Sequence, residues 1–280
     1  MEKLNYRILI VGVGGTGGLL ANYLCKSLAG SDNVDIALVD ADVVEKKNLL
    51  RQPYTLQDIG ESKASALASA LTDVYGLNVR TFDKYIESDK DVEDCLYYGS
   101  PMHFYDYNVI NIVCGCVDNH AARKCMHDYF VRKKLSRHMV EVPLLYVDSG
   151  NEFSYGEVVY AVKAKDGKIL SPDKLYYFPD LFDGDDMTPR SQESCEVLND
   201  SAPQHLATNM LAANIMLSGI LGLIQNGTMP SGMVTFDSGI SGGGFRVKQV
   251  PYVPEPEKEE KKERGGKKNG KTRKTGKISA

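Results

Sequence analysis

Five glycines stand among the seven residues 12–18, directly after the apolar run Ile-Leu-Ile-Val that covers 8–11. An apolar run that leads into such a segment is typical of a buried strand that turns into a helix. Glycine has no Cβ atom, so its backbone adopts positive φ and its N–H groups can approach a phosphate closely. The helix that follows directs its positive end toward the same place. These features predict a nucleotide site, whose glycines are Gly12, Gly14, Gly15 and Gly17.

An acidic residue, Asp40, ends the second expected strand, 34–40. A carboxylate at this place can accept hydrogen bonds from both hydroxyls of a ribose, although a strand-end aspartate can also be merely solvated. A glycine-rich turn followed by such an aspartate is typical of dinucleotide enzymes. An NAD-dependent oxidoreductase is therefore the first alternative.

Basic and amide residues in the next segment favour a different chemistry. Arg51 and Lys63 lie in this segment, with Asn48 and Gln52 as neutral hydrogen-bond donors. Hydride transfer needs no cation beside the phosphates. An enzyme that breaks the α–β bond of ATP must instead neutralise the charge that develops on the pyrophosphate leaving group. The cations therefore favour ATP chemistry over the oxidoreductase, and they also argue against a non-catalytic nucleotide-binding scaffold.

A third chemical signal is the carboxylate of Asp118, which follows the expected strand 109–113. It could hold Mg²⁺ against the phosphates. It could also begin the helix expected at 119–130, and the two roles are compatible. The five histidines show no metal-like clustering and no two cysteines have Cys-x-x-Cys spacing, so we expect no zinc.

Strands and helices alternate along the first half of the chain. The expected strands cover 7–12, 34–40, 77–82, 109–113 and 144–148, and the expected helices cover 16–29, 61–75 and 119–130. Parallel strands need helical crossovers, so the alternation predicts an α/β fold with a doubly wound, Rossmann-like, mostly parallel sheet. The segments that carry the chemistry all follow strands, at the edge of the sheet where ligands bind.

The second half of the chain does not continue this alternation of strands and helices. We expect an antiparallel strand at 156–162, a loop-rich insert at 166–201, a long apolar C-terminal helix from Pro203 to about residue 225, and antiparallel closing strands at 235–236 and 245–250. One nucleotide-binding domain would then cover 1–254, and a disordered, charged tail would cover 255–280.

Charge is unevenly distributed along the chain. The net charge is −4, yet residues 255–280 carry +5 and the remainder carries −9. The basic tail is either a solubilising segment or a contact with nucleic acid or an acidic partner. We expect neither a transmembrane helix nor a secretory leader, which predicts a cytoplasmic protein with reduced thiols and no membrane partner.

Six motifs occur in order between about residues 6 and 165. They are Gly-x-Gly-Gly-x-Gly, Asp-x-Asp-x-Val, Asn-Leu-x-Arg-Gln, Asp-Ile-Gly-x-x-Lys, Val-Asp-Asn and Asp-Ser-Gly-Asn. Together they resemble the ThiF/MoeB superfamily, the adenylating domains related to ubiquitin-activating enzymes. The resemblance implies that the chain binds ATP and Mg²⁺. It also implies adenylation of the C-terminal glycine carboxylate of a ubiquitin-like or sulfur-carrier protein, and a homodimer.

The resemblance also assigns roles to residues. Asp40 would hold the ribose, Asp118 would bind Mg²⁺, and the phosphates would contact Asn48, Arg51, Gln52 and Lys63. The same motifs bring Asp42 and Asn119 into the expected nucleotide site.

Cys195 lies ahead of Pro203 and the apolar helix. This arrangement resembles single-domain activating enzymes, and most of all the ThiF-type proteins encoded with PRTRC gene clusters. The resemblance implies that Cys195 accepts the acyl group as a thioester, which suits a thiolate near a helix N-terminus. It could instead be a structural thiol. The other five cysteines are expected to be buried and inert.

Two features depart from the superfamily pattern. The paired Cys-x-x-Cys motifs of its zinc-binding members are missing, and only six residues precede the first strand. Arg7 is therefore poorly placed to serve a partner's ATP site, as an N-terminal arginine does in many members. Arg123 is the substitute we consider, although an ion pair on a solvated helix face is the preferred interpretation.

Overall fold

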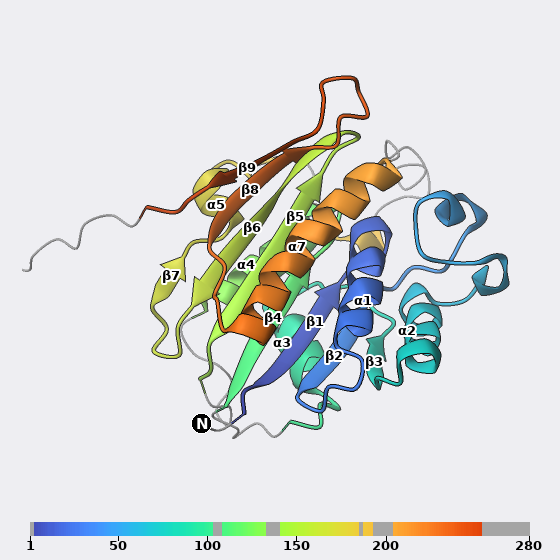
Figure 1. The fold of residues 1–280 in the computed structure, drawn as a ribbon, viewed down its shortest axis with the longest axis horizontal. Helices are drawn as coiled ribbons and strands as arrows, with labels where there is room; N and C mark the ends of the chain where they lie inside the picture. The colour runs from blue at the N-terminus through green and yellow to red at the C-terminus, as the bar shows by residue number, and fades with distance from the viewer. Residues whose placement is uncertain (1–2, 103–107, 133–140, 185–186, 193–203, 254–280) are drawn as a thin grey trace, which may run out of the picture.

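The computed structural model describes residues 3–102, 108–132, 141–184, 187–192 and 204–253. One nine-stranded sheet runs through them in the order β3-β2-β1-β4-β5-β6-β8-β9, with β7 beside β6 (Figure 1). The strands are β1 Asn5–Val11, β2 Val34–Val39, β3 Val79–Phe82, β4 Val109–Gly115, β5 Leu144–Asn151, β6 Tyr155–Lys163, β7 Ile169–Ser171, β8 Gly232–Asp237 and β9 Arg246–Val250. The α-helices are α1 Gly15–Ser27, α2 Lys63–Tyr75, α3 Asp89–Tyr97, α4 His120–Val131, α5 Lys174–Tyr177 and α7 Leu206–Asn226, and the 3₁₀ helices are η1 Lys46–Leu50, η2 Leu56–Asp58 and η3 Arg190–Gln192.

The strands from β3 to β5 pair in parallel, and those from β5 to β9 pair antiparallel. The order reverses between β1 and β4, which both lie at the centre of the parallel half. In a doubly wound sheet the crevice beyond the carboxyl ends of two such strands is where ligands bind. The predicted Rossmann-like fold with a C-terminal helix and antiparallel closing strands is confirmed.

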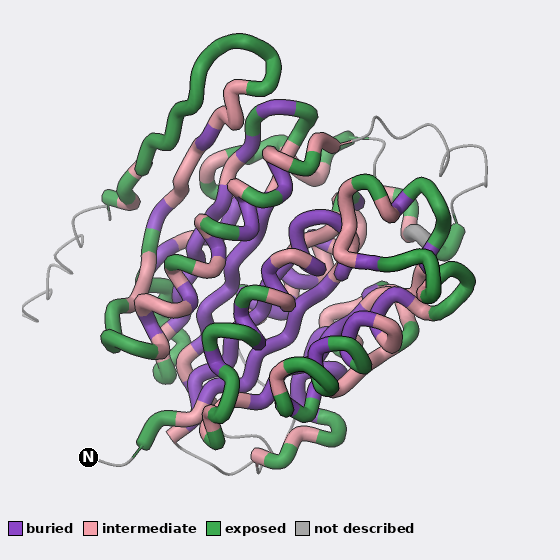
Figure 2. Tube along the Cα trace, turned by 45° about the vertical axis from the view of Figure 1, so that its right-hand side comes forward, coloured by how far each residue is buried: buried purple, intermediate pink, exposed green. Residues whose placement is uncertain are grey.

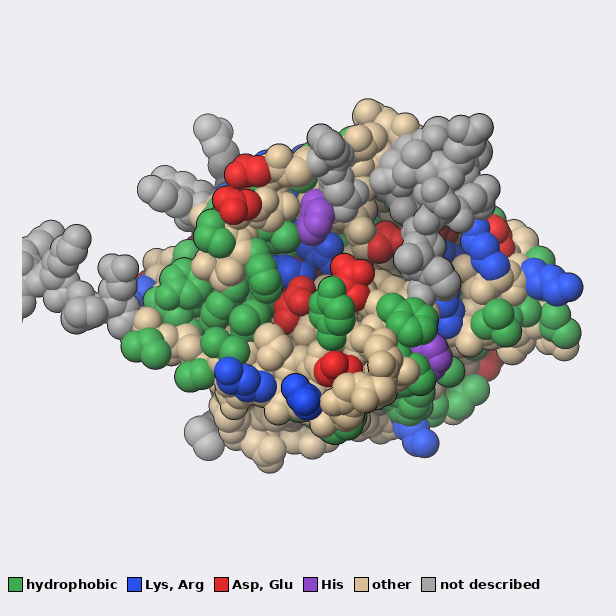
Figure 3. Space-filling view, turned by 90° about the horizontal axis from the view of Figure 1, so that it is seen from above, with side chains coloured by type: hydrophobic (Ala, Val, Ile, Leu, Met, Phe, Trp, Pro, Cys, Tyr) green, Lys and Arg blue, Asp and Glu red, His purple; other side chains and the backbone are tan. Residues whose placement is uncertain are grey.

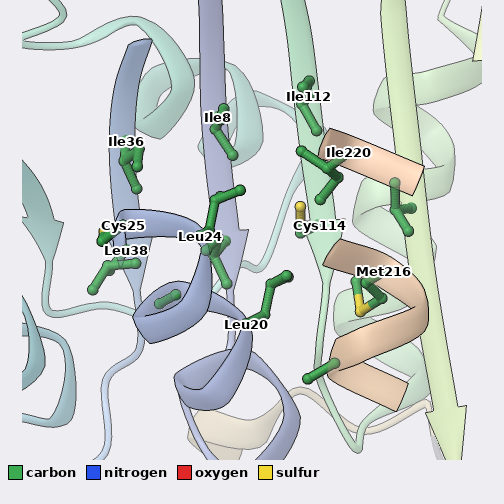
Figure 4. Packing of buried hydrophobic residues seen from close by; sticks show 14 of the residues in the cluster. Ile8, Leu20, Leu24, Cys25, Ile36, Leu38, Ile112, Cys114, Met216 and Ile220 are labelled. Atoms are coloured by element: carbon green, nitrogen blue, oxygen red, sulfur yellow. The ribbon is translucent and has the colours of Figure 1, made fainter. Parts of the chain in front are cut away.

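Helices cover both faces of the parallel half. α1, α2 and α7 pack on one face, where Leu20 and Leu24 of α1 and Met216 of α7 meet the isoleucines of the central strands (Figure 4). α3 and α4 cover the opposite face around residues such as Phe130. The central strands are therefore buried on both sides, while the edge strand β9 is largely exposed (Figure 2).

The helix α7 is the long apolar helix expected from the sequence. Its 21 residues are long and apolar enough to cross a membrane by length and composition, although no transmembrane helix was expected. In the fold, α7 packs against α1, β5, β6 and β8, and its residues Ala212, Met216 and Ile220 are buried in the core. Its apolar character is thus used for packing on the sheet.

The sequence also left elements unpredicted. Helix α3 was not predicted, because charged residues surround its short apolar stripe of Val92, Cys95 and Leu96. Ser88 caps this helix by accepting from the Asp91 N–H at 3.2 Å. A serine followed three residues later by an acid is a helix-start signal. The expected loop at 166–201 contains β7, α5 and η3. The tail at 255–280 lies outside the described residues.

Candidate functional site

A cavity of about 390 Å³ opens at the carboxyl ends of β1, β2 and β4. Figure 3 looks down on this end of the molecule, where acidic and basic side chains lie close together near the middle of the face. All the sequence-predicted nucleotide residues except Gly17 line the cavity: Gly12, Gly14, Gly15, Asp40, Asp42, Asn48, Arg51, Gln52, Lys63, Asp118 and Asn119. Gly17 lies in the first turn of α1 and is buried against Gly12.

The glycine turn fits an anion-binding site. Gly12 has a φ of +82°, and a Cβ atom there would lie 2.8 Å from the carbonyl oxygen of Cys116. A Cβ atom on Gly17 would collide with the carbonyl oxygen of Gly12, so Gly17 allows α1 to pack onto the turn. Gly14 precedes α1 and gives it no side-chain cap. The first N–H groups of α1 thus remain available to a phosphate.

Asp40 joins the turn to the end of β2. Its two carboxylate oxygens accept from the backbone N–H of Val13 at 2.8 Å and that of Asp42 at 2.9 Å. Burial raises the pKa of Asp40, while the charge of Lys63 opposes that shift. The carboxylate lines the cavity beside the turn, as a ribose acceptor would.

Lys63 is the first residue of α2 and is held from several sides. Its ammonium lies 2.8 Å from Asp42 Oδ2, and the Tyr85 hydroxyl donates to Asp42 Oδ1 at 2.8 Å. The Lys63 backbone N–H donates to the carbonyl oxygen of Asp42 at 2.9 Å. Tyr54 donates to the carbonyl oxygen of Val13 at 2.7 Å and lies 3.2 Å from that of Lys63. Tyr54 therefore links the glycine turn to the start of α2, the two parts of the expected phosphate site.

The second cation of the site, Arg51, stands at the C-terminal end of η1. The Glu45 backbone N–H donates to Asn48 Oδ1 at 2.7 Å, which caps η1 and buries Asn48. Arg51 and Gln52 follow at the end of this helix, and both of their backbone N–H groups donate to the Asn48 carbonyl oxygen. Among the described residues, the Arg51 guanidinium has no hydrogen bond or ion pair, and the buried Gln52 Oε1 has no donor. The guanidinium can pair with an anionic ligand group, and the amide oxygen can accept a hydrogen bond from a ligand N–H or O–H.

The carboxylate of Asp118 is exposed at the edge of the cavity, one residue before the buried Asn119. Asn119 caps α4 by accepting from the Ala122 N–H at 3.0 Å, so Asn119 rather than Asp118 fills the capping role. No group of three or more metal-ligating side chains occurs within the described ranges. One carboxylate at a phosphate-binding turn still fits Mg²⁺, which is usually held by one or two carboxylates together with phosphates and water.

Arg123 does not lie on a solvated face. It is buried, donates to the carbonyl oxygens of Val117 at 2.6 Å and Ser149 at 2.9 Å, and lies 3.4 Å from Asp148 Oδ1. The prediction of an ion pair is confirmed, and its solvated setting is wrong, because α4 packs against the end of β5. Arg7 is likewise buried, in β1, where it stacks on Tyr97 at 4.4 Å. Neither arginine is available to a second subunit.

The cysteines differ in part from the prediction. Cys25, Cys95 and Cys114 are buried, whereas Cys116 and Cys125 are partly exposed and Cys116 lines the cavity. Burial raises the pKa of Cys95 and Cys125 to about 11, and it raises the pKa of Cys116 as well. These thiols stay protonated at neutral pH. Cys195 lies outside the described residues.

Sequence reasoning missed a polar cluster on the far wall of the cavity. Thr16, Asn151 and Gln204 line this wall, and Asn209 of α7 lies directly beneath them. Asn151 belongs to the Asp-Ser-Gly-Asn motif, and its position at the carboxyl end of β5 was the available signal. Gln204 and Asn209 come from a distant part of the chain, so only the packing of α7 could reveal them.

Part of the chain is similar in sequence to known adenylyltransferases and modifier-activating enzymes. Over 130 residues the chain is 32% identical to the adenylyltransferase and sulfurtransferase MOCS3 of Drosophila virilis, covering 46% of this chain and 25% of that protein. It is 28% identical over 132 residues to ubiquitin-like modifier-activating enzyme 5 of Dictyostelium discoideum, covering 44% of this chain and 32% of that protein. The matched segment thus spans only a quarter to a third of these relatives.

Solved structures share the fold. The crystal structure of Escherichia coli MccB with AMPCPP and MccA aligns with a TM-score of 0.59 at 15% identity, over 89% of this chain and 64% of that one. The crystal structure of PaaA aligns with a TM-score of 0.57 at 18% identity, over 89% of this chain and 65% of that one. Residues 1–241 match the ThiF family. Since that match covers most of its length, the chain belongs to the ThiF family.

Proposed function

We propose that this protein is an ATP- and Mg²⁺-dependent adenylyltransferase that activates the C-terminal glycine carboxylate of a ubiquitin-like or sulfur-carrier protein. The observation that carries the proposal is the Arg51 guanidinium, which has no partner among the described residues and lies in the same cavity as the N-terminus of α1, which has no side-chain cap. NAD-dependent hydride transfer does not require a cation beside the phosphates, whereas cleavage of the α–β bond of ATP does. The family membership and the adenylyltransferase relatives support the same reaction class.

The chemistry follows from the arrangement of the cavity. The substrate carboxylate is already a nucleophile, so it attacks the α-phosphorus without a general base. The bond between the α-phosphorus and the bridging oxygen breaks, and pyrophosphate leaves with the electron pair. Charge then increases on the leaving group, where Arg51, Lys63 and the first N–H groups of α1 stabilise it. Gln52 and Asn48 add neutral contacts, and Asp40 fixes the ribose.

Asp118 is the residue that would hold Mg²⁺. The metal, when bound, would neutralise charge on the phosphates. Asp42 has a different role from direct phosphate contact, because its carboxylate is 2.8 Å from the Lys63 ammonium. It orients that cation toward the cavity, and Asn119 orders the loop that carries Asp118.

The acyl group would next pass to Cys195 or to an external thiol or sulfur carrier. Support for Cys195 comes from the described residues on either side of it. Asn119 donates to the Thr188 carbonyl oxygen at 2.9 Å, and Gln204 lines the cavity. The described residues Thr188 and Gln204, which flank Cys195 in the sequence, thus lie at or next to the cavity. The thiolate would displace AMP and form the thioester, in a homodimeric enzyme of the reducing cytoplasm.

The test is ATP–pyrophosphate exchange with a panel of ubiquitin-like proteins, starting with any encoded beside this gene. Exchange should require a protein that ends in free glycine and should fall by about 100-fold or more in Arg51→Ala. Lys46→Ala, an exposed change on the same 3₁₀ helix, is the matched control and should exchange normally.

The same assay separates the alternatives. Cys195→Ala should keep exchange while a thiol-sensitive covalent adduct with the substrate disappears. Tight ATP binding without exchange would favour a scaffold. Binding of NADH in place of ATP would favour the oxidoreductase and contradict the proposal.

A further inference from the structure

The cavity extends beyond the part that a nucleotide would fill. The ribose and phosphate residues lie at the ends of β1 and β2 and on η1, and Lys84 and Tyr85 after β3 extend that side. Thr16, Asn151 and Gln204 line the cavity on the opposite side, next to β5 and the start of α7. In an adenylation reaction the space beside the α-phosphate that the nucleotide leaves free must admit the attacking carboxylate.

This opposite side is made of neutral carboxamides. Asn151 Nδ2 donates to Asn209 Oδ1 at 2.6 Å, and Gln204 Nε2 donates to the Asn151 carbonyl oxygen at 3.0 Å. Each NH₂ group carries two hydrogens, so each keeps one further N–H that is not used in these contacts. Such donors hold a carboxylate or a peptide carbonyl while leaving the nucleophile's negative charge intact, which a lysine or arginine ion pair would not do.

Asn209 fixes this wall from below. It is fully buried on α7, and its Oδ1 also lies 3.5 Å from the Thr16 hydroxyl at the start of α1. Its Nδ2 has no hydrogen-bond partner among the described residues. A Cβ atom on Gly15 would collide with that Nδ2, so Gly15 is what lets α7 approach the glycine turn. A buried amide group without a hydrogen-bond partner lowers the stability of the fold. The role of Asn209 in the binding site accounts for why the fold tolerates this cost.

We propose that the wall formed by Asn151 and Gln204, positioned by Asn209, binds the terminal carboxylate and last peptide unit of the acyl substrate. This inference rests on the proposed adenylyltransferase function and assigns the side from which the carboxyl group enters. The occupant is an extended peptide C-terminus, because amide side chains match its carboxylate and main-chain carbonyl groups. Asn209 is a positioning residue, and Asn151 and Gln204 are the contact residues.

Two adenylate analogues test the proposal without knowledge of the natural substrate. N-acetylglycyl-sulfamoyladenosine imitates a glycyl adenylate with one peptide unit, and sulfamoyladenosine lacks the acyl arm. Calorimetric titration should show the wild-type protein binding the acylated compound about tenfold tighter or more, since it adds hydrogen bonds to the wall. Asn151→Ala and Gln204→Ala should each remove most of that ratio and leave sulfamoyladenosine affinity unchanged.

Variants on α7 separate positioning from general damage to the fold. Asn209→Ala should also lower the ratio, while Asn214→Ala, on an exposed position of the same helix, should keep it. Equal affinity of the wild-type protein for both compounds would overturn the inference and leave the nucleotide site intact. A parallel loss of affinity for both compounds in Asn151→Ala and Gln204→Ala would also overturn it. Failure of the wild-type protein to bind either compound would contradict the proposed function itself.

Discussion

Asp40 shows how a single residue can make nucleotide binding depend on pH. Burial raises the pKa of its carboxyl, so the group takes up a proton at a higher pH than the ordinary aspartate value of about 3.8. Protonation occupies an oxygen that would accept from a ribose hydroxyl. ATP affinity should therefore fall, as the pH is lowered, before ordinary aspartates titrate. Titration of ATP binding from pH 8 to 4.5 by calorimetry checks this.

The control for this prediction is Asp40→Asn, which should bind ATP weakly at every pH and lose most of the pH dependence. The same pKa shift has the opposite effect on folding stability, which falls rather than rises as the pH increases. A carboxyl whose pKa is higher in the folded than in the unfolded state lowers stability as the pH rises between the two values. Improved ATP binding at low pH would contradict the assigned role of Asp40.

The buried pair of Arg123 and Asp148 is a second prediction at this scale. Arg123→Ala should lower the free energy of unfolding by about 3 kcal/mol, at the lower end of the range for breaking a buried ion pair, because buried Asp148 then keeps only the Lys174 ammonium, 3.7 Å from its Oδ2. Denaturant titration measures the change. Lys124→Ala, which removes an exposed pair with Asp128 on the same helix, should cost less than about 1 kcal/mol. Similar costs for both variants would show that the pair is not buried in solution.

Glycine packing can be tested at the scale of a helix. Gly17→Ala should abolish tight nucleotide binding and destabilise the protein, because its Cβ atom would collide with the Gly12 carbonyl oxygen and lie 2.9 Å from Cys116 Cβ. Gly222→Ala on α7 is the matched control, since the nearest atom to its Cβ is 3.9 Å away. The control should be neutral or stabilising by up to about 1 kcal/mol. Thermal unfolding with and without ATP measures both effects, and normal ATP binding by Gly17→Ala would contradict the packing argument.

The elements also show why part of the site was readable from the sequence. The glycine turn, the aspartate after β2 and the Asn-Leu-x-Arg-Gln segment are local patterns, and each follows a strand whose apolar run is strong. The apolar stripe of helix α3 is short and lies among charged residues, so it gave a weaker signal. The solvated setting expected for Arg123 was wrong because the packing of α4 on β5 is not a local property. Asn209 was missed for the same reason. Its place in the site depends on how α7 crosses α1, some 190 residues away in the chain.

At the scale of the whole molecule, one continuous sheet joins the nucleotide cavity to the antiparallel strands. The cavity is lined from β1, β2, β4 and β5, and the last of these continues through β6 and β8 to β9. Two hydrophobic clusters, one on each face, bury the central strands. No described element lies outside this framework as a separate core. The structure is therefore expected to unfold as one cooperative unit.

The effect of bound ATP on thermal unfolding tests whether the chain unfolds as one cooperative unit. ATP with Mg²⁺ at about 100 times its dissociation constant should stabilise the native state by about 2.7 kcal/mol and raise the unfolding temperature of the whole chain by roughly 5–10 °C. Differential scanning calorimetry should show one transition that moves as a whole. Arg51→Ala should keep the ligand-free transition and lose most of the shift, since Arg51 has no described partner to lose. A second transition that ignores ATP would mean that the β6–β9 half folds independently, and the wall contributed by α7 would then be uncoupled from the nucleotide side.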